Sequence, residues 1–124
     1  MTPIHDIFKQ YIIDSGLVSD YKMQTFQWSD SGNAKDKFIV IAPDGGPPTL
    51  AGLGNEYGIM VTIVGDKNQT KAISDKVAEL LQYIVNNPQY PCIYHMYNLG
   101  GFPRPMFTAD KRIVFQIQIN VISN

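Results

Sequence analysis

Residues 59–85 read IMVTIVGDKNQTKAISDKVAELLQYIV, and two different hydrophobic periods meet within them. From Tyr57 to Val64 apolar side chains occupy every second position, with Met60, Thr62 and Val64 on the alternate face, which is typical of a strand. After Gly65 the apolar residues recur every three or four positions, which predicts an amphipathic helix with Asn68 or Thr70 as its N-cap. Its predicted stripe consists of Ile73, Val77, Leu80, Leu81 and Ile84, widened by Ala72, Ala78 and Val85. Such a stripe indicates a helix that lies flat on a sheet until Asn86-Asn87-Pro88 ends it.

A second helix is predicted at the start of the chain, over about residues 3–15. Thr2 is a suitable N-cap and Pro3 suits the first helical position. The apolar residues recur at helical spacing and comprise Ile4, Ile7, Phe8, Tyr11 and Ile12. Gly16 is predicted to end this helix.

Further strands are predicted over residues 21–28, 37–42, 93–97, 104–108 and 113–122. Residues 37–42 are apolar on both faces, which favours a central position, whereas Pro103 and Pro105 confine residues 104–108 to a sheet edge. Short connections favour antiparallel pairing, with the step across the second helix as the candidate parallel crossover. The sequence therefore predicts one α+β domain over residues 1–124, in which two amphipathic helices pack on a mostly antiparallel sheet of about four to six strands. The predicted order is α-β-β-loop-β-α-β-β.

A long loop rich in Gly and Pro is predicted over residues 44–56, and loops of this length in compact domains are often functional. Leu50 and Leu53 lie within it. They either dock on another subunit or fold back onto their own core. The Gly52-Leu53-Gly54 stretch lacks the third glycine of a nucleotide-binding fingerprint and precedes a strand, so we reject a phosphate-binding loop.

Composition excludes several classes of protein. The 124 residues include 10 basic and 11 acidic side chains, 44% are hydrophobic and 17% are charged, which argues against intrinsic disorder and against wrapping of nucleic acid. The apolar run Phe38-Ile39-Val40-Ile41-Ala42 is too short to span a membrane, and residues 1–6 do not form a secretory signal. Cys92 is the single cysteine, which suits a reducing cytoplasm.

The charge is unevenly divided along the chain. Residues 1–62 hold 4 Lys/Arg and 7 Asp/Glu (net −3), and residues 63–124 hold 6 and 4 (net +2). Ordinary scatter explains differences of a few charges, and complementary surfaces that meet between copies of the chain are the alternative.

Few residues suggest catalysis. Cys92 and His95 point to opposite sides of a predicted strand, so we interpret them as a small buried Cys beside a half-exposed His, and no metal site or cofactor is predicted. The cations Arg104, Lys111 and Arg112 lie near Phe102 and Phe107. This cluster either recognises phosphate or carboxylate groups or protects a strand end from aggregation. The last strand carries an uncharged polar face, which is either solvent-exposed or a hydrated interface, and which consists of Gln116, Gln118 and Asn120.

Several segments form a recognisable series along nearly the whole chain. After the N-terminal helix come Phe38-Ile39-Val40-Ile41, Asp44-Gly45-Gly46, the Gly/Pro loop, Ile59-Met60-Val61-Thr62-Ile63-Val64-Gly65, the helix from Lys71 to Val85, and Arg112-x-x-Phe115-x-Ile117-x-Ile119-Asn120-Val121-Ile122. In this order they resemble the tail terminator (tail completion) proteins of long-tailed bacteriophages and prophages. That family often has Gly-Pro before the penultimate strand, where this chain has Gly100-Gly101-Phe102-Pro103.

The resemblance implies a structural protein and not an enzyme. Such proteins form a ring, usually a hexamer, that caps the finished tail tube and joins it to the head connector. DNA then passes through the ring without being held. The resemblance implies assembly in the host cytoplasm, a final place in the virion tail, and no membrane partner.

A ring requires heterologous contacts that close by rotation. The candidate contact residues are Asp44, Leu50, Leu53, Arg104, Lys111, Arg112, Gln116 and Gln118. The alternative function is a small ligand-binding or enzymatic domain with its site between the 44–56 loop and the Arg104–Arg112 segment.

Overall fold

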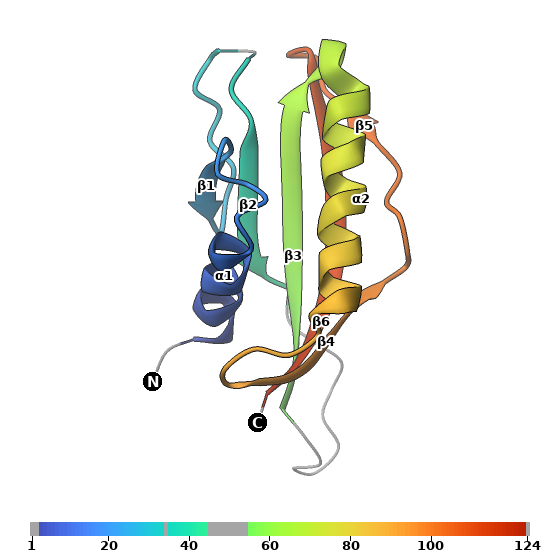
Figure 1. Ribbon diagram of the computed structural model, residues 1–124. Helices are drawn as coiled ribbons and strands as arrows, with labels where there is room; N and C mark the ends of the chain where they lie inside the picture. Colours follow the sequence, from blue (N-terminus) through green and yellow to red (C-terminus); the bar gives the residue numbers. More distant parts are fainter. Residues whose placement is uncertain (1–2, 34, 45–54, 124) are drawn as a thin grey trace.

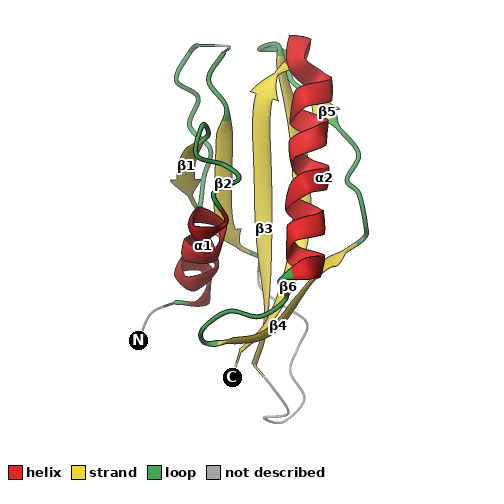
Figure 2. Cartoon of the chain, viewed as in Figure 1, coloured by secondary structure: helices red, strands yellow, loops and turns green. Residues whose placement is uncertain are grey.

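The computed structural model describes residues 3–33, 35–44 and 55–123, and its two helices lie on the same side of one sheet (Figure 1). The elements in chain order are α1 (Ile4–Ser15), β1 (Lys22–Thr25), β2 (Phe38–Pro43), β3 (Asn55–Asp66), the 3₁₀ turn η1 (Lys67–Gln69), α2 (Thr70–Asn86), β4 (Ile93–Leu99), β5 (Met106–Phe107) and β6 (Arg112–Ser123). Figure 2 shows this two-layer arrangement by element type. The predicted α+β class is confirmed.

The sheet has the order β1-β2-β3-β6-β4, and β5 pairs with β6. Its centre is the antiparallel pair β3 and β6, in register from Asn55 opposite Ser123 to Asp66 opposite Arg112. β4 is also antiparallel to β6, so β3 and β4 run in the same direction on either side of β6. The predicted crossover across α2 therefore joins parallel strands, but β6 lies between them.

β1 and β2 were expected to pair antiparallel, and this expectation is wrong. They are parallel, with Lys22 opposite Phe38 and Thr25 opposite Ile41. The connection over residues 26–37 is long enough to return the chain to the end of the sheet where β1 begins, which a tight hairpin cannot do.

Both helices bury their apolar stripes on one face of the sheet. Phe8, Tyr11 and Ile12 of α1 are at most 1% exposed. The buried residues of α2 are Ile73, Val77, Leu80 and Ile84. Val85 is 69% exposed and Ala72 and Ala78 are also exposed, so the stripe of α2 is narrower than predicted.

α2 crosses β3 closely at Gly65. A Cβ atom at that glycine would lie 2.3 Å from Cδ1 of Ile73, which is fully buried. This contact leaves no space for a larger side chain.

Both helices begin differently from the prediction. Pro3 is the N-cap of α1 and helical structure begins at Ile4, while Thr2 lies outside the described residues. Gly16 ends α1 in the left-handed conformation, as predicted, with φ of 72°. The backbone N–H of Asn68 donates to the carboxylate of Asp66, so the chain enters η1 first and Thr70 is already helical.

Strand lengths also differ. β1 stops at Thr25 because Phe26 adopts a φ of 72°, outside the strand region. β4 continues to Leu99, β5 contains only Met106–Phe107, and β3 begins at Asn55, inside the predicted loop. None of the helices in the described parts of the chain is long and apolar enough to cross a membrane.

At one end of the sheet, the described residues form a covering layer on the face opposite the helices. Phe38, Val64 and Val114 form a small second core there, and Trp28 from the β1–β2 connection packs against it. The indole of Trp28 meets the ring of Phe38 edge-on at 6.2 Å between centroids. The rest of this open face carries the polar side chains of β6.

Candidate functional site

Arg112 does not belong to a surface cluster, which corrects the sequence prediction. Its side chain is 1% exposed and lies on the open face of the sheet beneath the β1–β2 connection. The guanidinium donates to both carboxylate oxygens of Asp30, at 2.6 and 3.2 Å. It also donates to the carbonyl oxygens of Asn33, at 2.7 Å, and Asp36, at 2.5 Å. Arg112 therefore fixes the connection to the sheet.

The Arg112 hydrogen bonds hold the pKa of Asp30 below its usual value, with help from the backbone N–H of Gly32. Lys22 and Ser31 lower the pKa of the neighbouring Asp36 in the same way. The connection is thus held by charge-assisted bonds, which are stronger than those between neutral groups.

On the polar face of β6, the exposure of the side chains decreases along the strand. Gln116 is exposed, Gln118 is half-buried and Asn120 is 3% exposed. Tyr97 donates to the carboxylate of Glu56 at 2.6 Å, and Asn120 donates to the same oxygen at 3.0 Å. These bonds lower the pKa of Glu56, and the bond to Glu56 raises that of Tyr97. Asn120 is consequently a structural residue, whereas Gln116 and Gln118 remain accessible.

The alternative ligand site is not assembled by the described residues. Asp44 follows β2, and its N–H donates to the carbonyl of Gly58 near the start of β3. Arg112 pairs with Asp66 at the opposite end of β3. The eight residue steps from Gly58 to Asp66 span about 26 Å of strand, which separates the two parts of that site. Leu50 and Leu53 lie outside the described residues.

Arg104 and Lys111 are exposed, and they flank a run of exposed apolar side chains. We call residues 102–111 the outer segment. Its exposed apolar residues, with their exposed fractions, are Phe102 (51%), Met106 (44%) and Phe107 (57%). β5, within this segment, pairs with β6 at Ile113 and Val114. The segment therefore forms an apolar, basic edge of the molecule.

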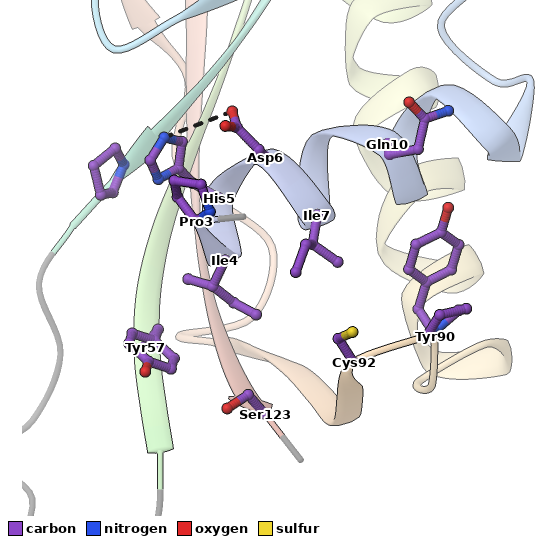
Figure 3. Close-up of a pocket in the computed structure, with 12 residues that line it drawn as sticks. Pro3, Ile4, His5, Asp6, Ile7, Gln10, Tyr57, Tyr90, Cys92 and Ser123 are labelled. Atoms are coloured by element: carbon purple, nitrogen blue, oxygen red, sulfur yellow. Dashed lines mark ion pairs between the residues drawn. The ribbon is translucent and has the colours of Figure 1, made fainter. Parts of the chain in front are cut away.

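A groove of about 910 Å³ opens beside the N-terminal half of α1 (Figure 3). We call it the α1 groove. Its described lining residues are Pro3, Ile4, His5, Asp6, Ile7, Gln10, Pro43, Tyr57, Tyr90, Pro91, Cys92 and Ser123. In Figure 3, Ile4, Ile7 and Cys92 point toward the space between α1, β3 and the turn before β4.

The rim of the α1 groove is acidic. Asp6 is 48% exposed and lies 3.7 Å from Nε2 of His5. Gln10 and Tyr90 both donate to the carboxylate of Asp14, which lowers the pKa of that group. None of the described lining residues is Lys or Arg. The groove thus presents apolar walls, with the carboxylate of Asp6 in its lining and that of Asp14 next to Gln10 and Tyr90.

Phe26 extends this apolar surface beyond His5. Its ring meets the His5 imidazole edge-on at 5.0 Å, and its side chain is 63% exposed. A φ of 72° is unfavourable for a bulky residue, and such strain occurs most often at functional positions. An exposed aromatic ring held in this way favours a contact surface.

Cys92 is exposed, so the prediction of a buried thiol is wrong. It occupies a tight turn in which Tyr90 and Ile93 exchange two backbone hydrogen bonds, and its φ is 72°. His95 lies beyond it on β4 and stacks on Tyr97 at 5.9 Å. Within the described ranges, no group of three or more His, Cys, Asp or Glu is placed to hold a metal ion.

Sequence reasoning missed the α1 groove. Ile4 and Ile7 were assigned to the buried stripe of α1, and both pack only partly against the core. Tyr57, Pro91 and Cys92 come from segments far apart in the chain, so no local pattern signals their meeting. The one local clue was the run Tyr90-Pro91-Cys92, a turn that carries an aromatic residue.

We compared the chain with models of known protein families and with curated proteins. No curated protein matches the chain. A family model described as "Phage tail termination protein" matches residues 1–124, the whole chain. The chain therefore belongs to the phage tail termination protein family, as its resemblance to tail terminators predicted.

Proposed function

We propose that this protein forms a homo-oligomeric ring of six copies that caps the tail tube when the tube reaches its final length. The observation that carries the proposal is the family match over the whole chain. Members of this family are structural components of the tail and not enzymes. In the proposed ring, one axial surface contacts the tube protein and the other contacts the head–tail connector.

Two features of the described residues support self-association. Apolar side chains are exposed both at the α1 groove and on the outer segment, and soluble monomers rarely expose such patches without a partner. The accessible polar side chains that β6 places on the open face, Gln116 and Gln118, are uncharged. A channel that lets DNA pass should not bind phosphate strongly, and uncharged amides meet that requirement.

The proposal places assembly in the host cytoplasm and the finished ring in the virion tail. The loop that carries Leu50 and Leu53 contacts either a neighbouring copy or the tube. Asp44 marks the point where this loop leaves the sheet, next to Pro43 of the α1 groove. Deletion of residues 50–54 should leave the far-ultraviolet circular dichroism spectrum intact and abolish ring formation or tube capping. Unchanged assembly of the deletion variant would exclude the loop from both contacts.

The ring is tested by measuring the mass of the purified protein in solution over a wide concentration range, with and without purified tail tubes. We expect a closed oligomer of about six copies, and electron microscopy should show it at one end of the tube. A monomer at every concentration that also leaves tube ends bare would refute the proposed function.

A further inference from the structure

The α1 groove and the outer segment complement each other in shape and charge. The groove has apolar walls and the carboxylate of Asp6 in its lining, and the carboxylate of Asp14 is hydrogen-bonded to the lining residues Gln10 and Tyr90. The outer segment exposes Phe102, Met106 and Phe107, as set out above. It holds two cations, Arg104 and Lys111, against one acid, Asp110. Apolar anchors within an oppositely charged rim are the usual anatomy of a specific protein interface.

The two surfaces lie on different sides of the molecule. The groove is bounded by α1, the end of β2 and the start of β3. The outer segment lies along the outer edge of β6, and in Figure 1 the connection from β4 to β5 runs on the far side of α2 from α1. One chain therefore cannot join these surfaces to each other. A second copy can, and each copy then retains one free groove and one free segment.

From this arrangement we infer that the α1 groove of one copy receives the outer segment of the next copy, with Phe107 as an apolar anchor and Arg104 beside Asp6. This inference rests on the proposed ring and identifies its subunit contact. The contact is heterologous, because two different surfaces meet, and repetition with a constant rotation closes a ring. It also explains why the exposed ring of Phe26 packs on His5 at the border of the groove, where a neighbour would cover it.

A disulfide test uses the native thiol in the groove. Phe107→Cys places a second thiol on the outer segment, and mild oxidation should link it to Cys92 of the next copy. Because every copy carries both halves of the contact, the products should form a ladder that extends beyond the dimer. Peptide mapping should show position 92 joined to position 107.

Two control variants define the background of this test. Val85→Cys places a thiol on the exposed face of α2, where the side chain is 69% exposed and belongs to neither surface. It should give no ladder. Phe107→Cys combined with Cys92→Ser should lose the ladder. A ladder of equal yield with Val85→Cys, or none with Phe107→Cys in a protein that assembles, would overturn the inference.

A charge exchange tests the contact without new covalent bonds. Asp6→Lys and Arg104→Glu should each raise the concentration needed for half-assembly about tenfold, since each creates like charges across the contact. Mixed in equal amounts, the two variants should assemble almost as well as the unaltered protein, because an alternating ring pairs opposite charges at every contact. Circular dichroism shows whether each variant is folded.

The outcomes separate the inference from the proposed function. If the unaltered protein forms rings and both charge variants assemble normally, the contact is refuted and the ring stands. If the charge variants form rings but no longer cap tubes, the tube protein occupies these surfaces and the inference is wrong. If the unaltered protein forms no ring even with tubes, the proposed function fails together with its contact.

Discussion

Replacement of Arg112 by Met should release the β1–β2 connection from the sheet. The variant keeps an unbranched apolar side chain but loses the hydrogen bonds that the guanidinium donates to Asp30, Asn33 and Asp36. Breaking a fully buried ion pair costs about 3–5 kcal/mol, because the remaining charge is left without solvent. Here the side chain of Asp30 is 29% exposed and the two carbonyls belong to a surface connection, so water can replace the lost donor. We therefore expect a loss of about 2–3 kcal/mol in the free energy of unfolding.

Urea denaturation measures this loss. Small domains unfold with slopes of about 1–3 kcal/mol per molar urea, so the midpoint should fall by about 1 M or more. Lys111→Met is the matched control, because it removes the same type of charge from the adjacent, exposed position. Hydrogen exchange should also show faster exchange at the amide of Asp36, which donates to the carbonyl of Asn33 inside the connection.

Acid titration gives an independent check. The folded-state pKa of Asp30 is lowered, so its contribution to stability is complete above its unfolded value of about 3.9 and is lost as the pH falls through the folded value. Arg112→Met removes that contribution. As the pH falls from about 5 through the folded-state pKa of Asp30, the free energy of unfolding of the variant should therefore decrease less than that of the unaltered protein. If Arg112→Met unfolds at the same urea concentration as Lys111→Met, Arg112 does not hold the connection in place.

Three further changes test other contacts. Gly65→Ala should destabilise the fold by about 1–3 kcal/mol in urea denaturation, because its Cβ would overlap the buried Ile73, and equal stability would show that α2 can shift away from β3. Cys92→Gly should raise the thermal midpoint, since glycine tolerates a positive φ, whereas Cys92→Val should lower it; the reverse order would contradict the turn geometry. Tyr97→Phe should return the pKa of Glu56 toward its ordinary value of about 4.3, seen by NMR titration, so that acid removes less stability than in the unaltered protein. An unshifted Glu56 pKa would show that Tyr97 does not stabilise its carboxylate.

The elements with a clear hydrophobic period were predictable from the sequence. The stripe of α2 and the alternation of β6 each report on one buried face, and one buried face is enough to identify a helix or a strand. The parallel pairing of β1 with β2 was not predictable, because connection length alone does not say where a chain returns. The predicted N-cap of α2 was wrong because Asp66 accepts a hydrogen bond from the N–H of Asn68 and begins a 3₁₀ turn ahead of Thr70.

Burial of charge was the main source of error at the candidate site. Arg112 shares a strand face with Gln116 and Gln118, so the pattern of β6 alone suggests an exposed cation. The structure buries it because the β1–β2 connection, from the opposite edge of the sheet, supplies a carboxylate and two carbonyl oxygens. Those partners lie 76–82 residues away in the chain, a distance over which periodicity carries no information.

A sheet with both helices on one face must satisfy its other face in some other way. Here Trp28 of the β1–β2 connection covers one end of that face, and Arg112 fixes the connection to the sheet. At the other end Tyr97 and Asn120 both donate hydrogen bonds to the carboxylate of Glu56. The described part of the open face is therefore suited to contact with water or with a partner that forms hydrogen bonds. The most exposed aromatic side chains of the groove border and the outer segment, those of Phe26 and Phe107, lie away from this face. In the proposed ring, we therefore expect the hydrophobic contribution to self-association to act between the sides of neighbouring copies.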